Sequence, residues 1–159
     1  ILSIICVPLS SCGLLLYNDN DTIAIKNLET LVGYIEKQDK DQIKKLFAPN
    51  IVDQLENFDQ QIDDLCAYYS GEYESFSAIG LGSGGISEYG KVKKDLEMLY
   101  DIHTTTQSFH LCMRWFIKDD FDENNIGIWS LYMESYINDN DCTTIEDWEI
   151  GIHLREPRE

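Results

Sequence analysis

The stretch EMLYDIHTTTQSFHLCMRWFIK, residues 97–118, is the clearest guide to the architecture, because its side chains alternate with a period of two. Successive side chains of a β-strand point to opposite faces of a sheet, so this alternation predicts two consecutive strands, at 97–106 and 108–118. A tight turn is all that can join them, which favours antiparallel pairing. One face of the pair collects Met98, Tyr100, Ile102, Thr104, Phe109, Leu111, Met113 and Trp115.

Three further segments have strand character, at 73–81, 125–137 and 148–154. Polar turns at 119–124 and 138–141 separate the later strands, and no helical pattern interrupts them. Parallel strands need a crossover of a dozen residues or more. The sequence therefore favours an antiparallel sheet over a βαβ arrangement.

The residues before the strands follow the three- and four-residue spacing of amphipathic helices. The pattern predicts a helix at 22–38, a short helical segment at 40–47 and a third helix at 50–70. Helices first and strands afterwards predict an α+β fold, in which N-terminal helices pack on a curved, mainly antiparallel sheet.

A separate signal lies at the N-terminus, where PLSSCG (8–13) follows the apolar run ILSIICV (1–7). The run is too short for a membrane-spanning helix, which needs about 20 apolar residues, but suits the core of a signal peptide. Leu9-Ser10-Ser11-Cys12 resembles the lipobox of bacterial lipoproteins, whose cysteine accepts a diacylglyceryl group. The resemblance implies that 1–11 is part of a signal peptide cleaved before Cys12, the lipidation site. A buried N-terminal helix or strand with an incidental thiol is the alternative.

With this interpretation, residues 12–21 form a lipidated tether and residues 22–159 a single domain at the outer face of the cell membrane. The chain carries 29 acidic and 12 basic residues, a formal net charge of −17. Such a surface repels phosphate backbones, so nucleic acid is not expected as a partner. Anionic headgroups are repelled as well, and the membrane contact is expected through the lipid.

Three cysteines remain after processing, Cys66, Cys112 and Cys142, and an odd number precludes complete pairing within one chain. Cys66 lies in a helical pattern and Cys112 in a strand pattern, so both are predicted to be buried packing residues. No CxxC pair or histidine spacing indicates a metal site, and no motif indicates a cofactor.

Two stretches resemble known families. LVGYIEKQDKDQIKKLF (31–47) looks like the opening of the nuclear transport factor 2-like superfamily, the cone-shaped fold of ketosteroid isomerases and many polyketide cyclases. With the lipobox, IGIWSLYMES (126–135) is similar to a family of Gram-positive lipoproteins known as domain of unknown function 5104. The resemblance implies a cone whose helices pack into the curved sheet and leave a pocket lined by aromatic residues.

In such a cone the candidates for the ligand pocket are Tyr69, Tyr100, Trp115, Tyr132 and Trp148. The isomerase members use an Asp base with a Tyr and a protonated Asp as oxyanion donors. Asp101 and His103, on one face of a strand, are the catalytic candidates here, with Tyr68, Tyr69, Tyr100 or Tyr132 nearby. None of them aligns with the isomerase set, and an Asp and a His at this spacing more often face solvent or pair structurally.

Two other motifs have structural explanations. The run GLGSGG (80–85) lacks the lysine of a phosphate loop, and we expect a mobile loop or a strand bulge there. Asp120, Asp122 and Asn124 resemble the first ligands of a calcium loop, but Asn125 replaces the turn glycine and Leu131 the bidentate Glu. A hairpin turn is the prediction.

The sequence thus predicts a lipid-anchored extracytoplasmic module that binds a small, partly apolar ligand or a protein partner without chemistry. The alternative is an isomerase- or hydratase-like enzyme that uses the cone pocket. A homodimeric structural module is the third class. An enzyme requires a buried carboxylate converging with a Tyr or His donor, a binding module requires aromatics with few titratable groups, and a homodimer requires an apolar outer sheet face.

Overall fold

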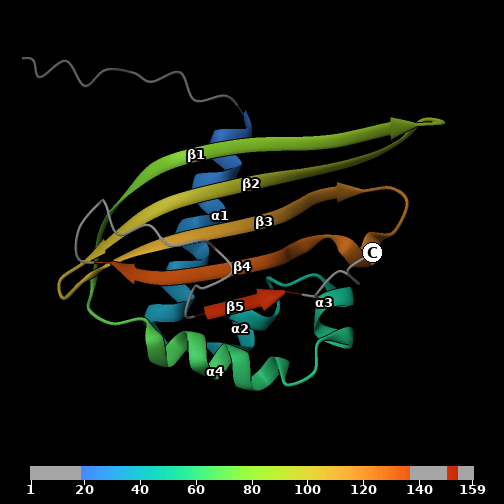
Figure 1. The fold of residues 1–159 in the computed structure, drawn as a ribbon. Helices are drawn as coiled ribbons and strands as arrows, with labels where there is room; N and C mark the ends of the chain where they lie inside the picture. The colour runs from blue at the N-terminus through green and yellow to red at the C-terminus, as the bar shows by residue number, and fades with distance from the viewer. Residues whose placement is uncertain (1–18, 137–149, 154–159) are drawn as a thin grey trace, which may run out of the picture.

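The computed structural model describes residues 19–136 and 150–153, and in these ranges the helices precede the strands (Figure 1). This order confirms the predicted α+β class. The elements are α1 (Asp19–Glu36), α2 (Lys40–Lys44), α3 (Pro49–Gln54), α4 (Phe58–Tyr68), β1 (Tyr73–Glu88), β2 (Lys91–Thr104), β3 (Ser108–Asp119), the 3₁₀ helix η1 (Glu123–Asn125), β4 (Gly127–Tyr136) and β5 (Ile150–His153).

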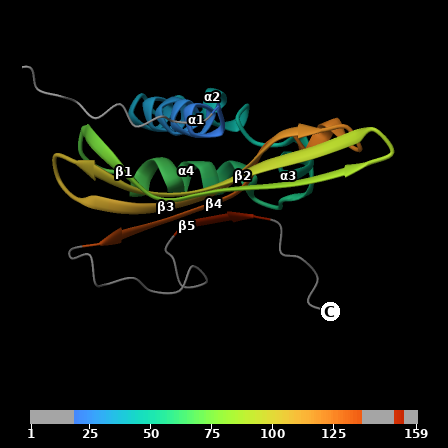
Figure 2. The same ribbon diagram turned by 90° about the horizontal axis from the view of Figure 1, so that it is seen from above.

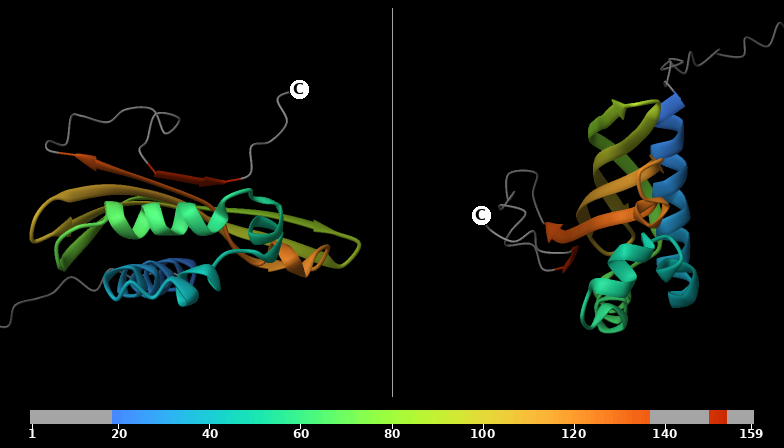
Figure 3. Two further views of the ribbon diagram at one scale, coloured as in Figure 1. Left: turned by 90° about the horizontal axis from the view of Figure 1, so that it is seen from below. Right: turned by 90° about the vertical axis from the view of Figure 1, so that its right-hand side faces the viewer.

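The strands form one open sheet in the order β1-β2-β3-β4-β5, and every neighbouring pair is antiparallel. The described helices lie on one face of this curved sheet, with α1 running across the strands (Figures 1 and 2). The opposite face of β2 and β3 has no helix against it in the described part of the chain (Figure 3). We call the two surfaces the helix face and the open face.

The helix pattern at 50–70 gives two helices rather than the single one predicted from the sequence. Pro49 is the first residue of α3, where the helix has no use for its missing N–H. α3 ends at Gln54, and the next residue, Leu55, is extended. Asn57 then takes a left-handed conformation, φ 60°, before α4 begins. A residue with this φ cannot continue a right-handed helix, so the chain turns and α4 packs in a new direction.

The expectation of a mobile loop at 80–85 is wrong, because β1 continues through these glycines to Glu88. Gly82 lies opposite Glu97, and Gly84 opposite Asp95. A Cβ on Gly84 would lie 2.6 Å from a carboxylate oxygen of Asp95, so this position has room only for glycine unless the carboxylate moves. The bulge expected there is present just before the run, where the register shifts between Ala78 and Gly80.

The loop resembling a calcium site is the connection between β3 and β4, as the sequence predicts. η1 closes it, and the side chain of Asp122 accepts a hydrogen bond from the backbone N–H of Asn124, 3.0 Å. Asn50 at the start of α3 donates to Asp122 (2.9 Å) and to Asn125 (2.8 Å). The polar side chains of this loop therefore hold the connection against α3.

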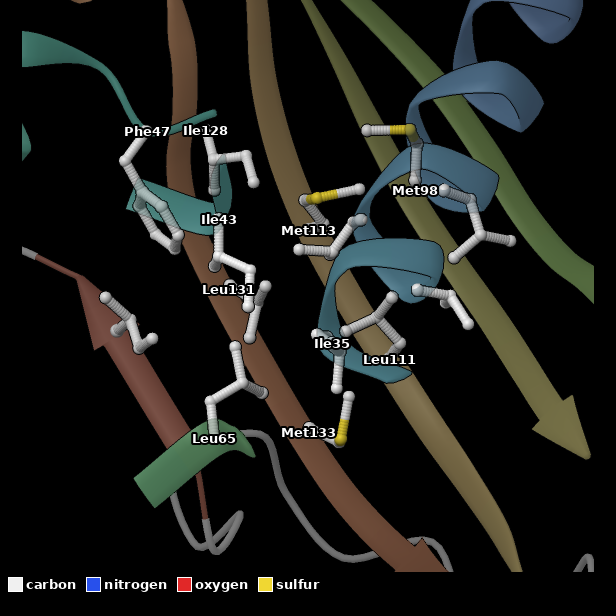
Figure 4. Packing of buried hydrophobic residues seen from close by; sticks show 14 of the residues in the cluster. Ile35, Ile43, Phe47, Leu65, Met98, Leu111, Met113, Ile128, Leu131 and Met133 are labelled. Atoms are coloured by element: carbon white, nitrogen blue, oxygen red, sulfur yellow. The ribbon is translucent and has the colours of Figure 1, made fainter. Parts of the chain in front are cut away.

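The hydrophobic core lies between the helices and the helix face of the sheet (Figure 4). The alternation that predicted β2 and β3 places their apolar residues as expected, with Tyr100, Ile102, Phe109 and Leu111 fully buried. Helix residues such as Ile35, Ile43 and Leu65 complete the layer, with Met113, Leu131 and Met133 from the strands. Burying each such side chain contributes about 1.5–3 kcal/mol, so this layer is the main source of stability.

Candidate functional site

The aromatic residues predicted to line one pocket lie on different faces of the sheet. Tyr69 stacks on the Phe109 ring at 5.3 Å on the helix face, and Trp115 packs against the same core. Tyr100 meets the ring of Phe76 at 5.6 Å and has an exposed fraction of 0%, so it is fully buried in the core. These rings are packing residues.

Tyr132 occupies the open face, where its position follows from the register. It pairs with Cys112 of β3, and its ring lies 5.0 Å from that of His153 on β5. The neighbouring Gly151 leaves room for the Tyr132 ring, which a Cβ there would approach to 3.4 Å. Trp148, the fifth candidate, lies outside the described residues. The four described candidates therefore do not converge on one cavity.

The catalytic candidates Asp101 and His103 also lie on the open face, and each has a different partner. His110 donates through Nδ1 to Asp101 at 2.5 Å, and His103 Nδ1 lies 2.9 Å from the hydroxyl of Ser108. The His110 ring stacks on Tyr136 with 4.0 Å between centroids. A carboxylate that holds an imidazole in this way fixes its tautomer, but His110 Nε2 is itself buried and out of reach of a dissolved substrate.

A second polar group on the open face, which the sequence did not reveal, surrounds Arg114. Its Nε donates to Asp95 at 2.9 Å and lies 3.8 Å from a carboxylate oxygen of Glu97. The guanidinium lies 5.1 Å from the centre of the Phe116 ring, and the ammonium of Lys93 lies 4.4 Å from the same ring centre. We call these five residues the Arg114 cluster. The five residues come from two neighbouring strands. Only the register between β2 and β3 could therefore have revealed the Arg114 cluster.

Asp119 ends β3 beside this cluster, with 1% of its surface exposed. Burial works to raise the pKa of its carboxyl, but hydrogen bonds outweigh it and hold the pKa below its usual value. The donors are the side-chain amide of Asn125 (2.9 Å) and the backbone N–H groups of Phe121 (2.9 Å) and Asp122 (3.1 Å), and Lys93 Nζ lies 3.5 Å away. The ionised carboxylate therefore organises the β3–β4 connection.

The two described cysteines are free thiols. Cys66 is buried on α4, as predicted, whereas Cys112 is only half-buried on the open face. Burial raises the pKa of both thiols, which keeps them protonated and poorly nucleophilic at neutral pH. Cys12 and Cys142 lie outside the described residues.

Two features are absent from the described ranges. Residues 19–136 and 150–153 contain no group of three or more His, Cys, Asp or Glu side chains placed to hold a metal ion. Among the helices of these ranges, none combines the length and apolar character needed to cross a membrane.

A small cavity of about 60 Å³ lies at the β1 edge of the sheet, under the first turns of α1. Sites for drug-sized ligands measure about 300–1,000 Å³, so this space suits the end of one side chain rather than a whole ligand. Both apolar and polar residues line it. The lining residues are Asn20, Asp21, Ala24, Leu81, Gly82, Ser83, Leu96 and Met98.

These features define a class of protein: an α+β domain with helices on one face of an open antiparallel sheet, and polar clusters on the other. Residues 30–144 match the model of a family described as Domain of unknown function (DUF5104), and the chain belongs to this family. The match confirms the resemblance to domain of unknown function 5104 seen in the sequence. No curated protein sequence matches the chain.

Proposed function

We propose that this protein is a lipid-anchored extracytoplasmic module that binds a protein partner and performs no chemistry. The observation that carries the proposal is a group of exposed apolar side chains at the end of the β1–β2 hairpin. Ile86 on β1 is 55% exposed and Tyr89, at the turn, is fully exposed. Phe121 and Ile126 of the β3–β4 connection are 45% and 42% exposed, and Lys91 next to the hairpin turn lies 5.5 Å from the Phe121 ring.

An apolar group of this kind stands out on a chain with a net charge of −17. Exposed aromatic and aliphatic residues rimmed by charges are typical of protein-binding surfaces. The four described aromatic residues expected to bind a small ligand, by contrast, pack in the core or lie across the sheet from it. A protein partner is therefore favoured over a small ligand.

The anchoring part of the proposal depends on the lipobox resemblance at Cys12. α1 begins at Asp19, seven residues later (19 − 12 = 7). Seven residues reach at most about 25 Å when fully extended. An acylated Cys12 would therefore hold the domain close to the outer face of the cell membrane.

We also infer that the fold is a variant of the nuclear transport factor 2-like cone. Support comes from the long α1 crossing the concave side of a curved sheet and from the helices that follow it on the same side (Figures 1 and 2). The pocket that such cones often contain would have to lie elsewhere than around Tyr69 and Tyr100.

The alternative, an isomerase- or hydratase-like enzyme, has the Asp101–His110 pair in its favour. Acid–base catalysis needs such a carboxylate and imidazole within reach of the substrate. The pair lies on the open face, away from Tyr69 and Tyr100, and His110 Nε2 is buried. A structural role in joining β2 to β3 explains the same contacts.

A homodimer through the open face has less support. The described part of that face carries Asp95, Glu97, Asp101 and Arg114 beside Leu99 and Cys112. It therefore lacks the continuous apolar surface that a symmetric sheet-to-sheet contact needs.

The test uses the full chain in its host, with a photo-crosslinking amino acid in place of Tyr89. We expect crosslinks to one protein from this position and none from Lys37, an exposed control position just after α1. A Cys12→Ala variant should appear in the medium instead of the membrane fraction. A small molecule retained in equimolar amount in native mass spectra, without a crosslinked protein, would overturn the proposal.

A further inference from the structure

We propose that the open edge of β1, from Gly80 to Ser87, receives an extended cationic segment of the partner as an additional strand. A lysine or arginine side chain of that segment would enter the cavity beside Asp21. The inference rests on the proposed binding of a protein partner and names the surface and the chemistry of the contact.

The first observation is that, among the residues the structure describes, one side of β1 has no neighbouring strand. β1 stands first in the sheet order and pairs with β2 only, within the described part of the chain. Its sixteen residues make it the longest strand, whereas β5 at the other edge has four. An unpaired edge presents a row of backbone N–H and C=O groups that can pair with another chain.

The second observation is that this edge lacks most of the devices that protect edge strands. Lysine, proline and inward-pointing charges commonly block unwanted pairing. Residues 75–87 contain no proline and no charged side chain, in a chain with 41 charged residues (12 + 29). The bulge between Ala78 and Gly80 bends only the first part, and from Gly80 to Glu88 the register with β2 is regular.

The third observation is that the approach to this edge is open. Every residue from Gly82 to Glu88 is exposed, and this part of the hairpin extends beyond the helices (Figure 1). Gly80, Gly82 and Gly84 lie on the open face opposite Leu99, Glu97 and Asp95. Without side chains there, a strand from another protein can come close to the β1 backbone.

The cavity of about 60 Å³ opens at the same place, because Leu81, Gly82 and Ser83 form part of its lining. Side chains of an added strand point alternately to the two faces, so every second one could reach the helix face there. Leu96 and Met98 contribute apolar atoms to the lining and Asp21 contributes a carboxylate, while the side-chain oxygen of Asn20 already accepts a hydrogen bond from Lys94 Nζ at 2.7 Å. Lysine and arginine match this arrangement, with an apolar stem and a cationic end.

Charge favours a cationic occupant over a second copy of the chain. Glu74 and Glu88 lie near the two ends of β1, and Glu97, with a side chain 66% exposed, lies opposite Gly82. Lys93 and Lys94 of β2 lie opposite Ile86 and Gly85, but the first pairs with Asp119 at 3.5 Å and the second donates to Asn20 at 2.7 Å. A second copy of the chain would bring a further net charge of −17. Its own β1 edge would offer no basic side chain between residues 75 and 87. Complementary charge speeds association and selects partners, while main-chain hydrogen bonds supply affinity in strand addition.

The experiment measures binding of a labelled peptide of alternating lysine and valine to the full chain by fluorescence anisotropy. We expect binding by this peptide and none by a glutamate–valine peptide. A fully backbone N-methylated lysine–valine peptide keeps the charges but loses the N–H donors, and it should not bind. Equal binding of the methylated peptide would overturn strand addition in favour of simple charge attraction.

Two variants locate the contact. Ser83→Lys places a positive charge on the edge, like that of the peptide, and should weaken peptide binding at least tenfold. Gln54→Lys, at an exposed position of α3, makes the same charge change and should leave peptide binding unaltered. Asp21→Asn should weaken binding about fivefold if a cation enters the cavity. Thermal unfolding confirms that each variant is folded. Unchanged binding by Ser83→Lys would reject the edge as the site, and a persisting crosslink from position 89 would then leave the proposed function standing.

Discussion

The two faces of β2 and β3 are built from alternate residues of the same strands, yet they are held by different forces. On the helix face, Met98, Ile102 and Leu111 are at most 1% exposed and belong to the hydrophobic core. On the open face, Arg114 donates a hydrogen bond to Asp95, and His110 donates one to Asp101. Burial is non-directional and additive over area, whereas the polar contacts depend on the register. The helix face should therefore determine how stable the fold is, and the open face should determine which strand positions face each other.

The largest expected effect comes from truncating the centre of the helix face. Phe109 is fully buried between Tyr68, at 5.7 Å, and Tyr69, at 5.3 Å. Phe109→Ala should lower the free energy of unfolding by about 3–5 kcal/mol, from lost burial and the cavity left behind. Urea unfolding measures this loss. Leu99→Ala on the open face, where the side chain is half-buried, should cost less than half as much, and equal losses would contradict the comparison.

An intermediate effect is expected from the Arg114 cluster. Arg114→Met keeps much of the stem but removes the charged donor from Asp95, whose side chain is only 6% exposed. We expect a loss of about 1.5–3 kcal/mol in the free energy of unfolding, the range for hydrogen bonds to charged groups. A double-mutant cycle with Asp95→Asn isolates the pair. Strictly additive losses would show that the two residues act independently.

The smallest effect is a change in the pH dependence of stability at Asp119. Its pKa is lower in the folded state than in the unfolded chain, so the ionised carboxylate favours folding above the unfolded value. This contribution is lost as the pH falls from about 4 through the folded pKa. Asp119→Asn should therefore be less stable than the native chain at pH 7, with a difference that shrinks in acid.

Urea midpoints at pH 7, 5 and 3.5 provide the measurement for Asp119. Asp53→Asn, at an exposed position on α3, serves as the control and should follow the native curve. A difference that grows as the pH falls would reverse the assigned sign.

The sequence predicted the helix face of β2 and β3 well, because burial follows directly from the alternation of apolar residues. At Gly80–Gly85 the glycine content predicted a mobile loop or a strand bulge; the bulge is present just before the run, but the loop is wrong, because β1 continues through the glycines. Pairing with β2 imposes the extended conformation there, and that pairing depends on residues a hairpin away. The break at Asn57 was missed for a related reason, since its left-handed backbone leaves no trace in the spacing of apolar residues.

The polar contacts of the open face were harder to predict than the core. Asp101 and His103 share a face as expected, but their partners come from β3: His110 for the first and Ser108 for the second. Identifying these pairs needs the β2–β3 register to within one residue, because a slip by one moves a side chain to the other face. Alternation alone gives the face of each residue and not its neighbour.

The order of strands in the sheet has a consequence for how the chain folds. Each described strand pairs with the strand next to it in sequence, and only Tyr89 and Gly90 separate β1 from β2. Contacts between neighbours in sequence close small loops and favour rapid folding. The packing of α4 against β5 spans most of the chain, and we expect it to form late. During synthesis the hairpins can therefore form one after another. The contact between α4 and β5 forms only after β5 has been synthesised.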